Sequence, residues 1–199
     1  MYLNIDHVND TLSSLITYTN STTSTIAPKL YIDHVAFISF KSSTNGSILY
    51  ANSSIMATFD SCVFTNTTAT NGGSLYFNNT VDSTITITSC QFINNNAKMY
   101  GGAIYFDSNN YHINILSSTF YSNTAGIGGG ALLSYSNNKN INILYTKFIA
   151  NKVPIDSSFN DGYNGGGAIF LSSNNHTSIY IYNSTFISNN ANYGIILLI

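Results

Sequence analysis

The chain has 199 residues, of which only 7% are charged, and its formal net charge at pH 7 is −2. All six basic residues are lysines and all eight acidic residues are aspartates, so Arg, Glu and Trp are absent. Six scattered lysines give no electrostatic footprint for nucleic acid. The missing Arg removes the usual bidentate clamp for phosphate or carboxylate substrates. Hydrophobic residues reach 44%, which excludes a disordered polar tract.

The length favours one domain over residues 1–199, with a sizeable core. The residues after Met1 form neither a basic nor an apolar leader region, so no signal peptide is predicted. The longest apolar run, residues 195–199, is too short to span a bilayer, and no transmembrane segment is predicted.

A repeat of about 27–28 residues runs along the chain. Ile5-Asp6-His7-Val8 recurs one repeat later as Ile32-Asp33-His34-Val35. A phenylalanine also recurs once in each repeat: Phe37, Phe64, Phe92, Phe120, Phe148 and Phe186. The last interval in this series is longer than the others, which indicates a loop insertion at residues 153–162. We expect about six rungs of a repeat architecture.

Within each repeat, short segments that alternate apolar and polar residues are bounded by Gly, Asn and Ser clusters, which is typical of strands and turns. Short strands at a fixed long period predict an all-β fold, a right-handed parallel β-helix. Its inward columns should hold the phenylalanines, the isoleucines five residues earlier, and the residues two before each phenylalanine: Cys62, Cys90, Ser118, Thr146 and Ser184. Asn at fixed turn positions tolerates left-handed backbone and can stack into ladders. These positions are Asn95, Asn123, Asn151 and Asn189.

An apolar strand follows each Gly-rich turn. Its first column is expected to be Ile48, Leu75, Ile104, Leu132 and Ile169, and its second Leu49, Tyr76, Tyr105, Leu133 and Phe170. One of the two columns must face outward, which predicts a partner surface, a glycan-stacking track, or a stripe covered by another part of a longer protein.

The paired motif of Phe-x-x-Asn followed by Gly-Gly-Ala-Ile resembles the repeats of the chlamydial polymorphic outer membrane proteins. The best copy is Phe92-Ile93-Asn94-Asn95 with Gly101-Gly102-Ala103-Ile104. The resemblance covers roughly residues 30 to 199. It implies a pectin-lyase-like β-helix in an extracellular or cell-surface protein tied to adhesion, and it transfers no catalytic residue.

Three aspartates that recur at the period of the repeat are the candidate ligand site. Asp6, Asp33 and Asp60 are expected to stack on adjacent rungs, with His7 and His34 beside them. Carboxylates about 5 Å apart raise one another's pKa or bind a cation, so Ca²⁺ and a glycan are the candidate ligands. The alternative is an exposed bend where polar residues are merely tolerated, since later rungs carry Thr88, Leu116 and Leu144 at this position.

The two cysteines are expected to stack on successive rungs and to face inward. Buried free thiols and a disulfide between Cys62 and Cys90 are both compatible with the predicted spacing.

The leading hypothesis is a non-enzymatic, adhesin-like β-helix that acts as an interaction or structural scaffold for a protein or glycan partner. The alternative is a β-helix that binds or cleaves a glycan through Asp6, Asp33 and Asp60. The last strand, near residues 195–199, also predicts either a fragment of a longer solenoid or end-to-end association.

Overall fold

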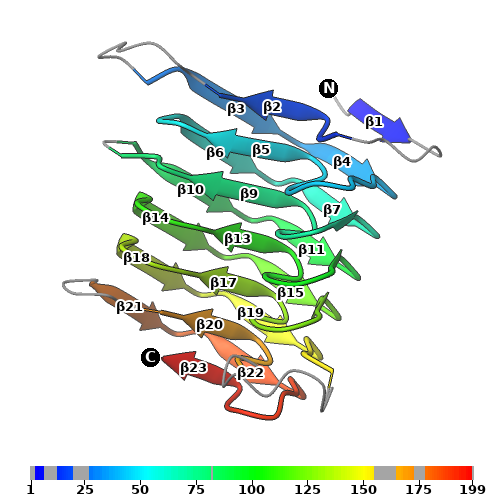
Figure 1. Cartoon of the computed structure of the whole chain (residues 1–199), viewed down its shortest axis with the longest axis vertical. Helices are drawn as coiled ribbons and strands as arrows, with labels where there is room; N and C mark the ends of the chain where they lie inside the picture. Colours follow the sequence, from blue (N-terminus) through cyan, green and yellow to red (C-terminus); the bar gives the residue numbers. More distant parts are fainter. Residues whose placement is uncertain are drawn as a thin grey trace.

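The computed structural model describes residues 3–6, 13–19, 27–81, 83–154, 165–172 and 178–198. Within them every regular element is a β-strand, and all strand pairs are parallel. Figure 1 shows the strands stacked as successive rungs along the length of the molecule. The predicted all-β parallel β-helix is confirmed. The described residues include no helix long and apolar enough to cross a membrane.

The first sheet, here called the Phe sheet, carries the recurring phenylalanine. Its seven strands are β1 (Leu3–Asp6), β4 (Val35–Ile38), β7 (Val63–Thr65), β11 (Gln91–Ile93), β15 (Thr119–Tyr121), β19 (Lys147–Ile149) and β22 (Thr185–Ile187). The predicted phenylalanine column is confirmed from Phe37 to Phe186 by the pairing of each ring with the next. Neighbouring rings stack with centroids 4.5–5.1 Å apart, which matches the spacing of paired strands.

The second sheet, here called the Ile sheet, precedes the Phe sheet in each turn. Its six strands are β3 (Lys29–Asp33), β6 (Met56–Asp60), β10 (Ile85–Thr88), β14 (Tyr111–Leu116), β18 (Lys139–Leu144) and β21 (Ile179–Tyr182). Ile87, Ile115 and Ile143 pair in register and are fully buried, as predicted for an inward column.

The third sheet, here called the Gly sheet, follows the Gly-rich turns. Its seven strands are β2 (Ile16–Tyr18), β5 (Leu49–Asn52), β9 (Leu75–Asn78), β13 (Ile104–Phe106), β17 (Leu132–Ser134), β20 (Ile169–Leu171) and β23 (Ile196–Leu198). Three two-residue strands, β8 (Thr68–Ala69), β12 (Asn96–Ala97) and β16 (Thr124–Ala125), form the fourth sheet. The Phe and Gly sheets each have one strand more than the Ile sheet, because the partial first turn contributes β1 and β2.

The core is continuous along the solenoid, and a ladder of buried asparagines lines one of its turns. The backbone N–H of Asn95 donates to Oδ1 of Asn123, 3.0 Å away, and the N–H of Asn123 donates to Oδ1 of Asn151 at the same distance. The Nδ2 group of Asn123 also donates to the carbonyl of Phe92 at 2.9 Å. The ladder predicted from the repeat is therefore present, and it satisfies backbone groups that would otherwise be buried without a partner.

The left-handed backbone lies one residue before the ladder. Asn94 (φ 54°), Ser122 (φ 56°) and Ala150 (φ 54°) are left-handed, whereas Asn95, Asn123 and Asn151 are not among the residues with positive φ. The prediction assigned both properties to the same Asn. The turn divides them between neighbouring residues, because the ladder side chain must point inward while the preceding residue reverses the chain.

The register of the Gly sheet corrects one predicted column. Leu49 pairs with Leu75, and Tyr50 pairs with Tyr76, so Ile48 does not belong to the inward column and Leu49 does not belong to the outward one. The predicted column was shifted by one residue because the rung between the equivalent left-handed residues Gly46 and Gly72 is shorter than the regular repeat. Of the insertion predicted at residues 153–162, only Val153 and Pro154 lie within the described residues.

Candidate functional site

The candidate site lies at the bend where the Ile sheet passes into the Phe sheet. In every turn the last residue of the Ile-sheet strand is followed by a left-handed residue, such as His34 (φ 54°) after Asp33 and Ser61 (φ 52°) after Asp60. The left-handed residue turns the chain, so that the next strand starts a new sheet. The side chain before it faces outward, and the side chain after it faces inward.

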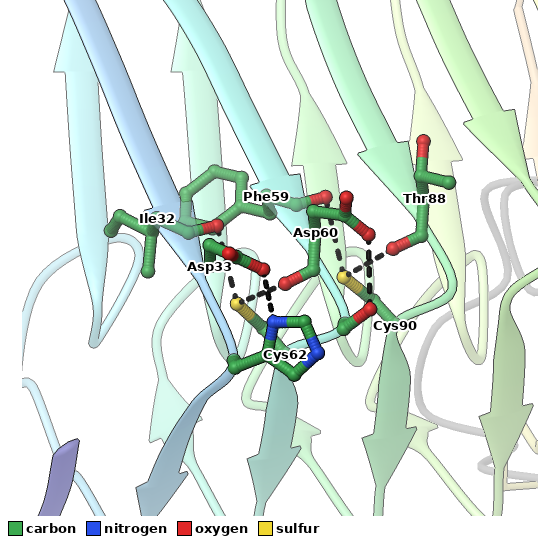
Figure 2. A network of polar contacts seen from close by, with 9 residues as sticks. Ile32, Asp33, Phe59, Asp60, Cys62, Thr88 and Cys90 are labelled. Atoms are coloured by element: carbon green, nitrogen blue, oxygen red, sulfur yellow. Dashed lines mark hydrogen bonds and ion pairs between the residues drawn. The ribbon is translucent and has the colours of Figure 1, made fainter. Parts of the chain in front are cut away.

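Asp33 and Asp60 stand side by side at this bend, as predicted. They are paired in register on β3 and β6, and Figure 2 shows them on neighbouring strands. Nδ1 of His34 contacts Oδ1 of Asp33, and the Ser61 hydroxyl donates to Oδ1 of Asp60 at 3.0 Å. The side chains of His34 and Asp33 are 48% and 41% exposed, so both can reach a ligand.

The third aspartate is not part of this column. Asp6 pairs with Ile38 in the Phe sheet, not with Asp33 in the Ile sheet. The prediction was wrong at this point because Ile5 aligns with Phe37, so the first turn is longer than the regular repeat. The similarity to Ile32-Asp33-His34-Val35 does not follow the strand register. His7 lies outside the described residues.

The remaining pair, Asp33 and Asp60, provides few ligands for a metal ion. Within the described part of the chain, no group of three or more His, Cys, Asp or Glu residues could hold a metal ion. Asp33 and Asp60 supply oxygen ligands of the type that Ca²⁺ prefers, but Ca²⁺ takes six to eight such ligands. Calcium binding therefore stays a prediction.

An apolar hollow adjoins Asp33. It has a volume of about 550 Å³ and is lined by Leu15, Ile16, Tyr31, Ile32, Val35 and Phe37 together with Asp33. Tyr31 is 65% exposed and lies on the same outward face of β3 as Asp33. An exposed ring beside a carboxylate offers both an apolar and a hydrogen-bonding surface to a ligand.

Two thiols lie on the inner side of the same bend, behind Asp60 and Thr88. Cys62 and Cys90 follow Asp60 and Thr88 by two residues, are both buried, and are free thiols. The Sγ of Cys62 donates to the carbonyl of Asp60, and that of Cys90 to the carbonyl of Thr88, each at 3.2 Å (Figure 2). The inward orientation predicted for both cysteines is confirmed. In the described structure they are free thiols, not a disulfide.

The outward column of the Gly sheet is aromatic but barely exposed. Tyr76, Tyr105, Leu133 and Phe170 form a second apolar cluster, separate from the core, with exposed fractions of 1–7%. The Tyr76 hydroxyl donates to Oδ2 of Asp107 at 2.5 Å. Burial, followed by the hydrogen bond to Asp107, raises the pKa of Tyr76. The predicted external stripe therefore exists, but it is mostly closed to solvent.

The stripe opens at its N-terminal end. A pocket of about 330 Å³ lies against the ring of Tyr50, which stacks on Tyr76 with centroids 5.1 Å apart. The rest of its lining is uncharged: Ser13, Ser14, Thr17, Thr44 and Asn45.

The sequence did not single out a patch of exposed tyrosines at the opposite end of the Ile sheet. Tyr180 and Tyr182 stack on the outer face of β21 with centroids 6.0 Å apart, and Tyr145 meets Tyr182 edge-on at 5.7 Å. Their exposed fractions are 50–55%. The alternation Ile-Tyr-Ile-Tyr over residues 179–182 carries the signal, because inward isoleucines place both tyrosines outward. We call Tyr145, Tyr180 and Tyr182 the tyrosine patch.

The stacked parallel sheets and the columns of like residues define a parallel β-helix. Residues 15–198 match the family model described as a right handed beta helix region, and the chain belongs to this family. No curated protein and no solved structure matches the chain.

Proposed function

We propose that this β-helix is a non-enzymatic interaction scaffold that binds a protein partner through its outer face. The observation that carries the proposal is the tyrosine patch, three half-exposed rings in contact on one edge of the Ile sheet. Tyrosine is enriched at protein interfaces and at their energetic hot spots, because it buries a large rigid ring and keeps a hydroxyl for hydrogen bonding.

The chemistry around the patch supports a partner recognised by shape and stacking rather than by charge. The chain has only 7% charged residues and no Arg, so electrostatic steering is weak and binding should depend little on salt. The motifs that resemble those of the polymorphic outer membrane proteins support a cell-surface or extracellular location and an adhesive role. End-to-end association of β-helices stays a prediction.

A second candidate function is glycan binding at Asp33 and Asp60. The observation that favours it is the in-register pair of carboxylates beside His34 and the exposed ring of Tyr31. Asp6, one of the three acids first expected there, is not on this column. Acid–base cleavage of a glycan would need a positioned acid and base, and the in-register carboxylates of Asp33 and Asp60 are the candidates for these roles.

Binding arrays with matched variants separate the two functions. Wild-type protein is applied to a protein array of extracellular domains and to a glycan array, with and without Ca²⁺. The variants are Tyr180→Ser/Tyr182→Ser in the tyrosine patch and Asp33→Ala at the bend. We expect protein binding that is lost in the tyrosine variant and kept in Asp33→Ala. A specific glycan signal that Asp33→Ala abolishes would contradict the proposal and support the second function.

A further inference from the structure

Cys62 and Cys90 occupy equivalent positions on consecutive rungs. The residues that follow them, Val63 and Gln91, pair in register, and the N–H of Gln91 donates to the carbonyl of Cys62 at 2.8 Å. Neighbouring strands lie about 4.8 Å apart, and a disulfide joins residues whose Cα atoms lie about 4.4–6.8 Å apart. Both side chains face inward, so the pairing of the two rungs places the Cα atoms of Cys62 and Cys90 within the range that a disulfide can bridge.

The two thiols also shift each other's pKa. The neighbouring Cys90 thiol lowers the pKa of Cys62 to about 7, and the neighbouring Cys62 thiol raises the pKa of Cys90. The Cys62 thiol therefore loses its proton before the Cys90 thiol does. A thiolate beside a second thiol is the arrangement that forms an intramolecular disulfide after oxidation.

We propose that Cys62 and Cys90 form a redox modification site that closes into a disulfide between two rungs, with a peroxide as the oxidant. Cys62 and Cys90 are 0% and 1% exposed, so a bulky thiol reagent is excluded from the folded protein, and peroxide, a smaller molecule, enters by local opening of the rungs. Closure ties β7 to β11 directly behind Asp60, and so stiffens the bend that carries the candidate ligand site.

The chemistry takes two steps. The Cys62 thiolate attacks one peroxide oxygen and the O–O bond breaks. Hydroxide leaves and becomes water, and Cys62 becomes a sulfenic acid. The Cys90 sulfur then attacks the Cys62 sulfur and the S–O bond breaks. The oxygen leaves as water with the Cys90 proton. Two thiols and one peroxide thus give one disulfide and two waters, and each sulfur loses one electron to an oxygen.

The chain supplies its own control substitution. Ser118 and Ser184 occupy the same inward column, and each hydroxyl donates to the carbonyl two residues earlier, as the two thiols do. Serine is therefore compatible with this column, and Cys62→Ser and Cys90→Ser should fold like the wild type.

The test is hydrogen peroxide treatment of folded wild-type protein, followed by denaturation, thiol alkylation and mass spectrometry. Cleavage after lysine releases residues 42–98 as one peptide that contains both cysteines. We expect this peptide to lose two hydrogen atoms and to become resistant to alkylation until dithiothreitol is added. The oxidised protein should melt about 5–10 °C higher than the reduced protein, and neither serine variant should show the change.

Every other outcome contradicts the proposal. One such outcome is a folded protein whose two thiols stay alkylatable after peroxide. Others are a peptide that gains oxygen atoms instead of losing hydrogens, covalent dimers, and a disulfide that forms only in urea.

Discussion

Two columns of side chains lie at the same bend, two residues apart along the chain. They repeat at the same interval but differ in side-chain chemistry and in the contacts that they make. From Cys62 onward the inward column uses only small groups that hydrogen-bond, Cys62, Cys90, Ser118, Thr146 and Ser184, whereas its first member is Val35. The outward column mixes carboxylate, hydroxyl, aliphatic and aromatic side chains: Asp33, Asp60, Thr88, Leu116, Leu144 and Tyr182.

From Cys62 onward the inward column is uniform because each rung repeats the same backbone contacts. The N–H of Cys90 donates to the Ser118 hydroxyl at 3.1 Å, and the N–H of Thr146 donates to the Ser184 hydroxyl at the same distance. The outward column makes no such repeated contact, so its residues are free to vary. The difference teaches that outward positions whose residues depart from the repeat are the best candidates for a binding function.

The largest expected effect comes from adding one atom where rungs touch. A Cβ on Gly102 would lie 2.0 Å from the Gly130 carbonyl oxygen and 2.7 Å from the Thr124 backbone, which belong to the next rung. Neither contact can relax by a side-chain movement. We expect Gly102→Ala to lower the free energy of unfolding by about 4 kcal/mol or more, measured by urea titration with circular dichroism. The neighbouring Ala103→Gly, which removes a Cβ, should lower it by about 1 kcal/mol; equal effects would contradict close contact between rungs.

The next effect compares an inward asparagine with an outward one. Asn123→Ala leaves the N–H of Asn95 and the carbonyl of Phe92 buried without their partner, and should destabilise the fold by about 3 kcal/mol. Asn114, whose Oδ1 accepts from Asn142 on the outer face, is half-buried, and Asn114→Ala should cost less than about 1 kcal/mol. The same urea titration measures both changes in the free energy of unfolding. Equal losses would contradict the claim that inward asparagines stabilise the fold more than outward ones.

A smaller effect appears at alkaline pH. Burial raises the pKa of Tyr76 and of Tyr105 above the ordinary value near 10, and the carboxylate of Asp107 adds to both shifts. Their contribution to stability is complete below about pH 10 and is lost above it, by about 1.4 kcal/mol per pH unit for each tyrosine. Between pH 9 and pH 11, the melting temperature should fall less steeply with pH in Tyr76→Phe than in the wild type. Tyr121→Phe, at an exposed position, should keep the wild-type dependence of melting temperature on pH. The same dependence in Tyr76→Phe would contradict the buried hydrogen bond between Tyr76 and Asp107.

The smallest effect on stability is expected at the bend itself. Asp33 is 41% exposed and contacts the exposed His34, so Asp33→Asn should change the free energy of unfolding by less than about 0.5 kcal/mol. Urea titration of this variant beside the wild type measures the change. A loss above about 2 kcal/mol, the size expected when a buried polar group loses its partner, would show that the acidic pair is structural.

The inner columns could be predicted because they recur at the period of the solenoid. Phe92, Phe120 and Phe148 are spaced by one rung, and the strand register follows that spacing. Asp6 could not be placed in this way, because the first turn is longer than the regular repeat that a short similarity suggested. The hydrogen bond from Tyr76 to Asp107 could not be predicted either. It joins residues on different rungs whose proximity depends on side-chain direction as well as on register.

The central claim is that the inward amide ladder holds the rungs together while the outer face is free for binding. Native-state hydrogen exchange tests it most directly, because the backbone N–H groups of Asn95, Asn123 and Asn151 each donate to the side chain of the next rung. We predict that these three amides exchange among the slowest in the protein, at rates near those of global unfolding. Exchange of these three amides at rates far above that of global unfolding would contradict the claim.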